Sequence, residues 1–106
     1  MSKGKEYLNL IGLAYRARKL TLGEELIIKD IQKQKAKLVL LASDTGPQTT
    51  KKITDKCNFY DIPIRVVDDR DTISHAIGKS GRVAIAILDE GFASKITSLL
   101  DKSIRG

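Results

Sequence analysis

The sequence has little sulfur and no long apolar run, and each shortage excludes a class of protein. Cys57 is the only cysteine, so no intramolecular disulfide can form and a reduced, intracellular setting is expected. No apolar stretch approaches the roughly 18 residues that cross a bilayer. The N-terminus lacks the apolar core of a signal peptide. We therefore expect a cytoplasmic protein without a membrane span.

The chain is also poor in the side chains that many metal and nucleic-acid sites use in number. His75 is the only histidine, and one histidine with one cysteine cannot assemble an ordinary structural zinc site. The aromatic residues are too few for a surface that stacks many single-stranded bases; they are Tyr7, Tyr15, Phe59, Tyr60 and Phe92. We expect no metal and no cofactor.

A basic balance is present, and it is distributed unevenly. The net charge of +6 favours anionic partners such as nucleic acid, although many proteins are basic for solubility alone. Residues 1–37 hold nine Lys/Arg and four Asp/Glu, an excess of five positive charges, whereas the remaining residues hold ten and nine. This concentration in the first third of the chain is typical of a binding face.

The apolar pattern predicts helices that alternate with buried strands. Helical spacing of apolar residues predicts helices over 3–18, 23–34, 46–58, 71–78 and 91–101. Short apolar runs predict strands over 38–42, 64–67 and 83–88, with a further short strand at 21–22. This alternation predicts a three-layer α/β/α sandwich with a small mixed sheet, in a single domain over residues 1–106.

Capping residues indicate where these helices begin. Thr21 to Glu24 fits a capping box before the second helix. Pro47 suits the first turn of the third helix, where its missing N–H costs little. Asp71 and Asp89 are the predicted caps of the last two helices.

Two short patterns resemble small-molecule sites and are explained more simply in other ways. Gly78-Lys79-Ser80 resembles the end of a phosphate-binding loop, but Ile73 stands where that loop needs glycine. Asp44, Asp68 and Asp69 follow strands and would suit Mg²⁺ in an enzyme or receiver domain. Turn and helix-cap chemistry accounts for these aspartates, so we predict no catalytic residue.

The start of the second helix is the most informative segment. Gly23 would let a phosphate backbone approach the free N–H groups of the first turn. Glu24 and Glu25 suit base recognition, because a carboxylate accepts hydrogen bonds from exocyclic amino groups. Lys29 and Lys33 would hold flanking phosphates. The alternative is an ordinary helix with a Glu25–Lys29 pair, worth about 0.2–0.5 kcal/mol.

Several segments fall in register with one known family. They are 12–19, 23–29, 36–39, 42–44, Pro47, Cys57, 62–63 and Gly78. In order and spacing they resemble the L-seven-Ae family of kink-turn-binding ribosomal proteins, and within it the small bacterial members of the YlxQ type. Residues 23–29 stand in place of the family's Gly-x-Asn-Glu-x-x-Lys signature, with Glu25 at the Asn and Leu26 at the Glu. The bacterial branch uses Gly-Glu-Glu here, so Glu24 and Glu25 would share the base-reading role.

The resemblance implies a protein that binds sharply bent RNA, without catalysis. In the family, the start of the second helix reads tandem sheared G·A pairs in a groove that the bend opens. The loop before the last strand, here residues 79–83, contacts the extruded nucleotide. This loop is about one residue short, and Ser74 replaces a usual glycine. The predicted RNA-binding residues are Gly23, Glu24, Glu25, Lys29, Lys33, Arg18, Lys19, Lys79 and Arg82.

The expected partner is therefore structured RNA, and the chain is expected to act as a monomer in a ribonucleoprotein. Ribosomal RNA, a riboswitch and other structured transcripts all remain open as the target. The alternative from a different class is a protein-interaction or regulatory module on the same fold. An exposed apolar patch would mark that alternative.

Overall fold

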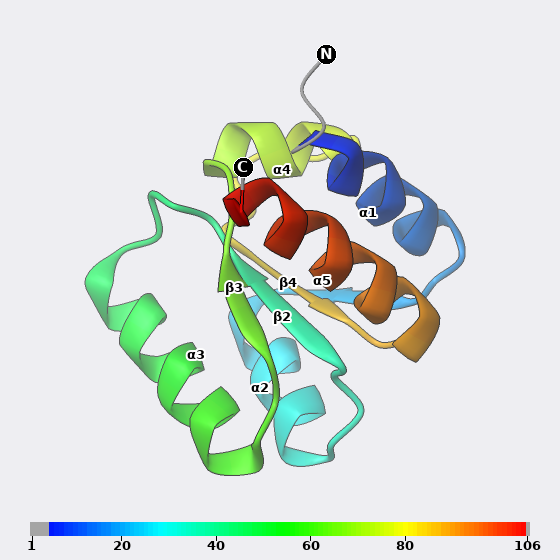
Figure 1. The fold of residues 1–106 in the computed structure, drawn as a ribbon. Coiled ribbons are helices and arrows are strands. Elements are labelled where there is room, and N and C mark those ends of the chain that lie inside the picture. The colour runs from blue at the N-terminus through cyan, green and yellow to red at the C-terminus, as the bar shows by residue number, and fades with distance from the viewer. Residues whose placement is uncertain (1–4, 106) are drawn as a thin grey trace.

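A computed structural model describes residues 5–105, with side chains to Lys102, and shows helices on both faces of one small sheet (Figure 1). The helices are α1 (Glu6–Arg16), α2 (Glu24–Gln32), α3 (Pro47–Tyr60), α4 (Arg70–Ala76) and α5 (Glu90–Arg105). The strands are β1 (Leu20–Leu22), β2 (Leu38–Leu41), β3 (Ile64–Val66) and β4 (Ala84–Ile87). The predicted α/β/α sandwich with a small mixed sheet is confirmed.

The strands lie in the order β1-β4-β2-β3, so β1 and β3 form the two edges of the sheet. Strand β4 runs antiparallel to both β1 and β2, whereas β2 and β3 are parallel. The register pairs Leu22 of β1 and Leu40 of β2 with Ile85 of β4. The segment that follows β1 therefore lies at the same end of the sheet as the segment that precedes β4.

The two central strands bury both faces, which explains why they are apolar without interruption. Leu38 and Leu40 of β2 pack with α1, α4 and α5, while Val39 and Leu41 pack with α2 and α3. Strand β4 alternates in the same way, with isoleucines on the first face and alanines on the second. Cys57 is buried on the α3 side as a small apolar residue, and burial raises the pKa of its thiol to about 11.

The predicted capping box at the start of α2 is wrong, because its threonine belongs to the sheet. Thr21 pairs with Ala86 in the β1–β4 ladder. Its hydroxyl donates to the Asp30 carboxylate at 2.5 Å, which fastens the middle of α2 to β1. The N-cap of α2 is instead Gly23, without a side-chain cap.

The predicted cap of α4 is also wrong, since the helix begins earlier than expected. The Asp69 carboxylate accepts from the backbone N–H of Thr72 at 2.8 Å, and Asp71 lies in the first turn. Helix α5 does begin at its predicted cap, because the Asp89 carboxylate accepts from the N–H of Phe92 at 2.9 Å. Pro47 opens α3 as expected. The expected start of the first helix, Lys3, lies outside the described residues.

Candidate functional site

The candidate site forms where two segments far apart in the sequence meet. Gly23 follows β1 directly, and Arg82 lies two residues before β4. Because Leu22 pairs with Ile85, the start of α2 and the end of the 79–83 loop lie at the same end of the sheet. The structure therefore brings Gly23, Glu24, Glu25 and Arg82 into one neighbourhood, as the sequence predicted.

Gly23 leaves bare backbone at the start of α2. Its φ of +93° lies in a region that side-chain-bearing residues rarely adopt. Apart from Gly23 and its two chain neighbours, no atom lies within 4 Å of the position that a Cβ would take. A ligand can therefore come close to the backbone at Gly23, beside the first-turn N–H groups that have no partner within the helix.

The two neighbouring glutamates of α2 have different surroundings. The Glu24 carboxylate lies 3.1 Å from the Lys52 ammonium on α3. This contact, with a further hydrogen bond from Thr49, holds the pKa of Glu24 below its ordinary value of 4.5. Glu25 projects about 100° away around the helix and is exposed. Among the described residues, the ion pair at this helix start is Glu24–Lys52 instead of the Glu25–Lys29 pair of the alternative.

The remaining basic residues of α2 extend the site along its outward face. Lys29 and Lys33 are exposed, one and two turns after Glu25, and Ile27 and Ile31 are buried on the opposite side. This is the division that the spacing predicted. A ligand bound at Gly23 and Glu25 would meet both ammonium groups if it ran along the helix.

Arg18 and Lys19 do not join this cluster. The carbonyl of Lys19 accepts from the backbone N–H of Leu88, at the far end of β1. The three residues of β1 separate Lys19 from Gly23 by about 13 Å. Both side chains are exposed, so they lie on the same edge of the molecule as the cluster but apart from it.

Ser74 of α4 holds the 79–83 loop through two hydrogen bonds to the backbone of Arg82. The Ser74 hydroxyl accepts from the Arg82 backbone N–H at 2.8 Å and donates to the Arg82 carbonyl at 3.2 Å. Ser74 is 1% exposed. The Lys79 ammonium lies 5.8 Å from the ring centroid of Tyr15, within the range of a cation–π contact. One fixed hydroxyl thus holds the loop at its join with β4.

Arg82 also carries an unsatisfied group. Within the part of the chain that the structure describes, its Nε is a buried side-chain nitrogen with no hydrogen-bond partner. An unpaired buried donor costs free energy.

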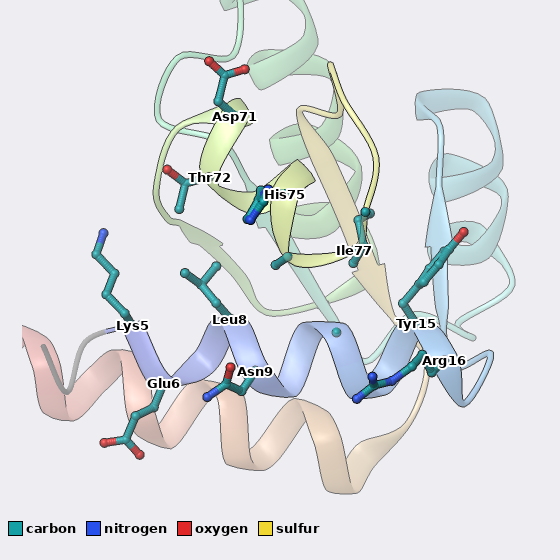
Figure 2. A pocket seen from close by; sticks show the side chains of 13 residues that line it. Lys5, Glu6, Leu8, Asn9, Tyr15, Arg16, Asp71, Thr72, His75 and Ile77 are labelled. Carbon is teal, nitrogen blue, oxygen red and sulfur yellow. The ribbon is translucent and has the colours of Figure 1, made fainter. Parts of the chain in front are cut away.

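A separate groove lies between α1 and α4 (Figure 2). Its volume is about 1110 Å³, and it holds none of the predicted site residues. Its charged lining is mixed, with Lys5 and Arg16 against Glu6 and Asp71. It reaches the candidate site only at its Gly78 end, where the loop begins.

The aspartates that would suit Mg²⁺ are bound to other groups. The Asp44 carboxylate accepts from the backbone N–H and the Nε of Arg70, at 2.9 and 3.1 Å. Asp68 accepts from the Tyr7 hydroxyl and the Lys5 ammonium. Across residues 5–105, no group of three metal-ligating side chains was found. Over the same residues, no helix has the length and apolar character that a membrane crossing requires.

Comparison with known proteins places these features in a family. The chain is 51% identical to the RNA-binding protein YlxQ of Bacillus subtilis over 92% of its own length and 98% of the relative's. It is 26% identical to the large ribosomal subunit protein eL8 of Thermoplasma volcanium, over 79% of this chain and 70% of that one.

Solved structures agree on the fold. A Bacillus halodurans protein of unknown function is 47% identical and superposes with a TM-score of 0.88, covering 91% of this chain and 97% of that one. The Giardia lamblia 15.5kD RNA binding protein is only 16% identical, and it shares the fold with a TM-score of 0.80 over 99% and 91% of the two chains.

The family assignment rests on a match over most of the chain. The sequence model of the ribosomal protein L7Ae/L30e/S12e/Gadd45 family matches residues 5–97. The resemblance predicted from the order and spacing of the motifs is thereby confirmed. The chain belongs to the ribosomal protein L7Ae/L30e/S12e/Gadd45 family, and is similar within it to the bacterial YlxQ proteins.

Proposed function

We propose that this protein binds kink-turn or similarly bent structured RNA, without catalysis, through the start of α2 and the 79–83 loop. The observation that carries the proposal is the meeting of these two segments at one end of the sheet, in a chain 51% identical to an RNA-binding protein. The protein would act in the cytoplasm as a single-domain monomer. Ribosomal RNA is one candidate source of the bent segment.

The geometry supports a different role in RNA binding for each part of the site. Bare backbone at Gly23 allows close approach of the RNA, and the exposed Glu25 carboxylate would accept from base amino groups. Lys29 and Lys33 would contact phosphates along the outward face of α2. A bend in the RNA matters because it opens a groove that A-form helices keep too narrow for side chains.

The 79–83 loop and the basic residues outside α2 would make further contacts with the RNA. Arg82, which is partly exposed at the end of the loop, would meet the extruded nucleotide with its guanidinium. Lys79, Arg18 and Lys19 would contact or attract phosphates outside the bend. Glu24 is assigned a supporting part, because its carboxylate is bound to Lys52 on α3.

The test is a binding titration against a kink-turn RNA beside a straight duplex of equal length. We expect clear preference for the bent RNA, which Glu25→Ala and Lys29→Ala should each reduce while the far-UV spectrum stays unchanged. Lys95→Ala is the matched control, because Lys95 is exposed on α5, on the opposite face of the sheet from α2.

Equal weak binding to both RNAs would contradict the proposal, since a basic surface alone does not distinguish shape. The protein-interaction alternative would then lead. It would be supported by partners that are recovered from lysate in the same amount after ribonuclease treatment.

A further inference from the structure

One large apolar side chain lies exposed in the middle of the charged site. Leu26 stands in the first turn of α2 and is 57% exposed. Its neighbours along the chain on the outward side are Glu25 and Lys29, both exposed. Ile27, the next residue, is fully buried, so the outward position of Leu26 follows from the helical period.

Leu26 lies beside both the bare backbone at Gly23 and the first of the lysines on the surface of α2. Residues three apart on a helix are surface neighbours, so Leu26 adjoins Gly23 on one side and Lys29 on the other. Apart from Gly23 and its two chain neighbours, no atom approaches the Cβ position of Gly23 within 4 Å. A ligand that contacts both the Gly23 backbone and the Lys29 ammonium would therefore lie beside Leu26 as well as Glu25.

The first turn of α2 is held in place, so this exposure is a fixed feature of the surface. The backbone N–H of Ile27 donates to the Gly23 carbonyl at 2.9 Å. On the other side of the helix, the Glu24–Lys52 ion pair joins the same turn to α3. Leu26 is presented between these two attachments.

We infer that Leu26 is an apolar contact for one nucleobase of the bent RNA, an assignment that rests on the proposed function. A leucine can donate and accept nothing, so it offers an RNA only surface to cover. The flat face of an unstacked base is the large apolar surface that a bend exposes. Leu26 would thus select for RNA that presents such a face beside Gly23, while Lys29 supplies affinity for any phosphate.

The test measures affinity and salt dependence together for Leu26→Ala. Alanine favours helix, so the fold should be preserved. Covering a leucine is worth enough that its removal should weaken kink-turn binding about tenfold. The slope of log affinity against log salt should not change, because no charge is removed. Lys29→Ala should instead make that negative slope shallower by about 0.9, because one fewer phosphate is neutralised.

Matched variants separate a binding role from a general effect. Leu26→Met keeps an apolar surface and should retain affinity within about threefold. Leu13→Ala removes a comparable exposed leucine, 44% exposed on α1, and should leave affinity unchanged. If Leu26→Ala binds as wild type does, while wild type still prefers bent RNA, the Leu26 assignment falls and the proposed function stands. If wild type shows no preference for bent RNA, the proposed function itself fails.

The contacted group is identified with kink-turn RNAs that each lack one base in the bent segment. If Leu26 covers a base, the effect of Leu26→Ala should vanish for one abasic RNA and persist for the others. An effect that persists for every abasic RNA would overturn the base contact, because the leucine would then cover ribose.

Discussion

At the scale of single residues, Ser74 is a buried side chain that holds the 79–83 loop through its hydrogen bonds. Its buried hydroxyl binds both backbone groups of Arg82. Gly78, just before the loop, and Gly81, within it, have positive φ values of 68° and 69°, which glycine adopts without strain. The loop can turn freely at its glycines, and Ser74 selects one arrangement.

Ser74→Ala should destabilise the protein by about 1–3 kcal/mol, because it leaves buried backbone groups of Arg82 without their partner. It should also weaken RNA binding, since the loop would then have to be ordered on association. Urea denaturation and the kink-turn titration measure the two effects. Ser80→Ala, at an exposed position of the same loop, should change stability by less than about 0.5 kcal/mol. Equal denaturation midpoints for the two variants would count against the anchoring role.

The sequence predicted only part of the arrangement of the site, since Arg18 and Lys19, which were predicted with the others, lie apart from the start of α2. Gly23, Glu25 and Lys29 were predicted from their order along one helix, and their outward positions follow from its period. The separation of Glu24 from Glu25 was not predictable, because Lys52 lies 28 residues further along the chain and reaches Glu24 only through the packing of α2 on α3. The RNA-contacting roles themselves stay predictions.

At the scale of the elements, α1 and α4 approach each other closely at Gly12. A Cβ placed there would lie 2.9 Å from the backbone carbonyl oxygen of Ala76. A glycine in a helix normally costs about 0.5–1 kcal/mol relative to alanine. Here the close crossing requires it, because a backbone oxygen cannot move aside as the end of a side chain can.

Gly12→Ala should therefore destabilise the protein by about 1–3 kcal/mol, the usual cost of overpacking, despite its better helix propensity. Thermal denaturation should show the loss as a lower Tm. Gly46→Ser is the control, because that position is open and serine is favoured at a helix N-cap. A Gly12→Ala variant more stable than wild type would show that the two helices separate at little cost.

The existence and order of the elements were predictable, whereas several of their starts were not. Ile27, Ile31 and the runs of β2 and β4 are buried as their periods predicted. The caps of α2 and α4 were misplaced for different reasons. Thr21 is paired with Ala86 in the sheet, a tertiary contact that a local capping pattern does not show. Asp69 and Asp71 are both plausible local caps, and in the structure Asp69 accepts from the N–H of Thr72 three residues on.

At the scale of the whole molecule, the excess positive charge surrounds one edge of the sheet. Residues 5–37, the described part of the basic first third, hold eight Lys/Arg and four Asp/Glu, a surplus of four, and include α1, β1 and α2. Strand β1 is one of the two edge strands, and α1 and α2 lie on opposite faces of the sheet beside it (Figure 1). The charge that the sequence concentrates in one third of the chain is therefore also concentrated in space.

Binding to kink-turn RNA should depend steeply on salt. If three to five phosphates are neutralised, log affinity should fall with log salt at a slope of about −2 to −4.5. Lys33→Ala should make the slope shallower by about 0.9, and Lys95→Ala, away from this edge, should leave it unchanged. Titrations at several salt concentrations provide the measurement, and a flat response in wild type would rule out a phosphate-based interface.

The order of the strands also places the two edges of the sheet, β1 and β3, on opposite sides of the molecule. With the charge at the β1 edge, RNA would be held from one side, and the β3 edge at the opposite end of the sheet would face outward from the complex. The exposed Asn58, close to the end of α3 that precedes β3, is accordingly a suitable place for a fluorophore or a surface tether. A fluorophore at Asn58 would stay outside the interface and leave binding undisturbed. A fluorophore at Ser80 would lie beside the bound RNA, and its fluorescence should change on binding.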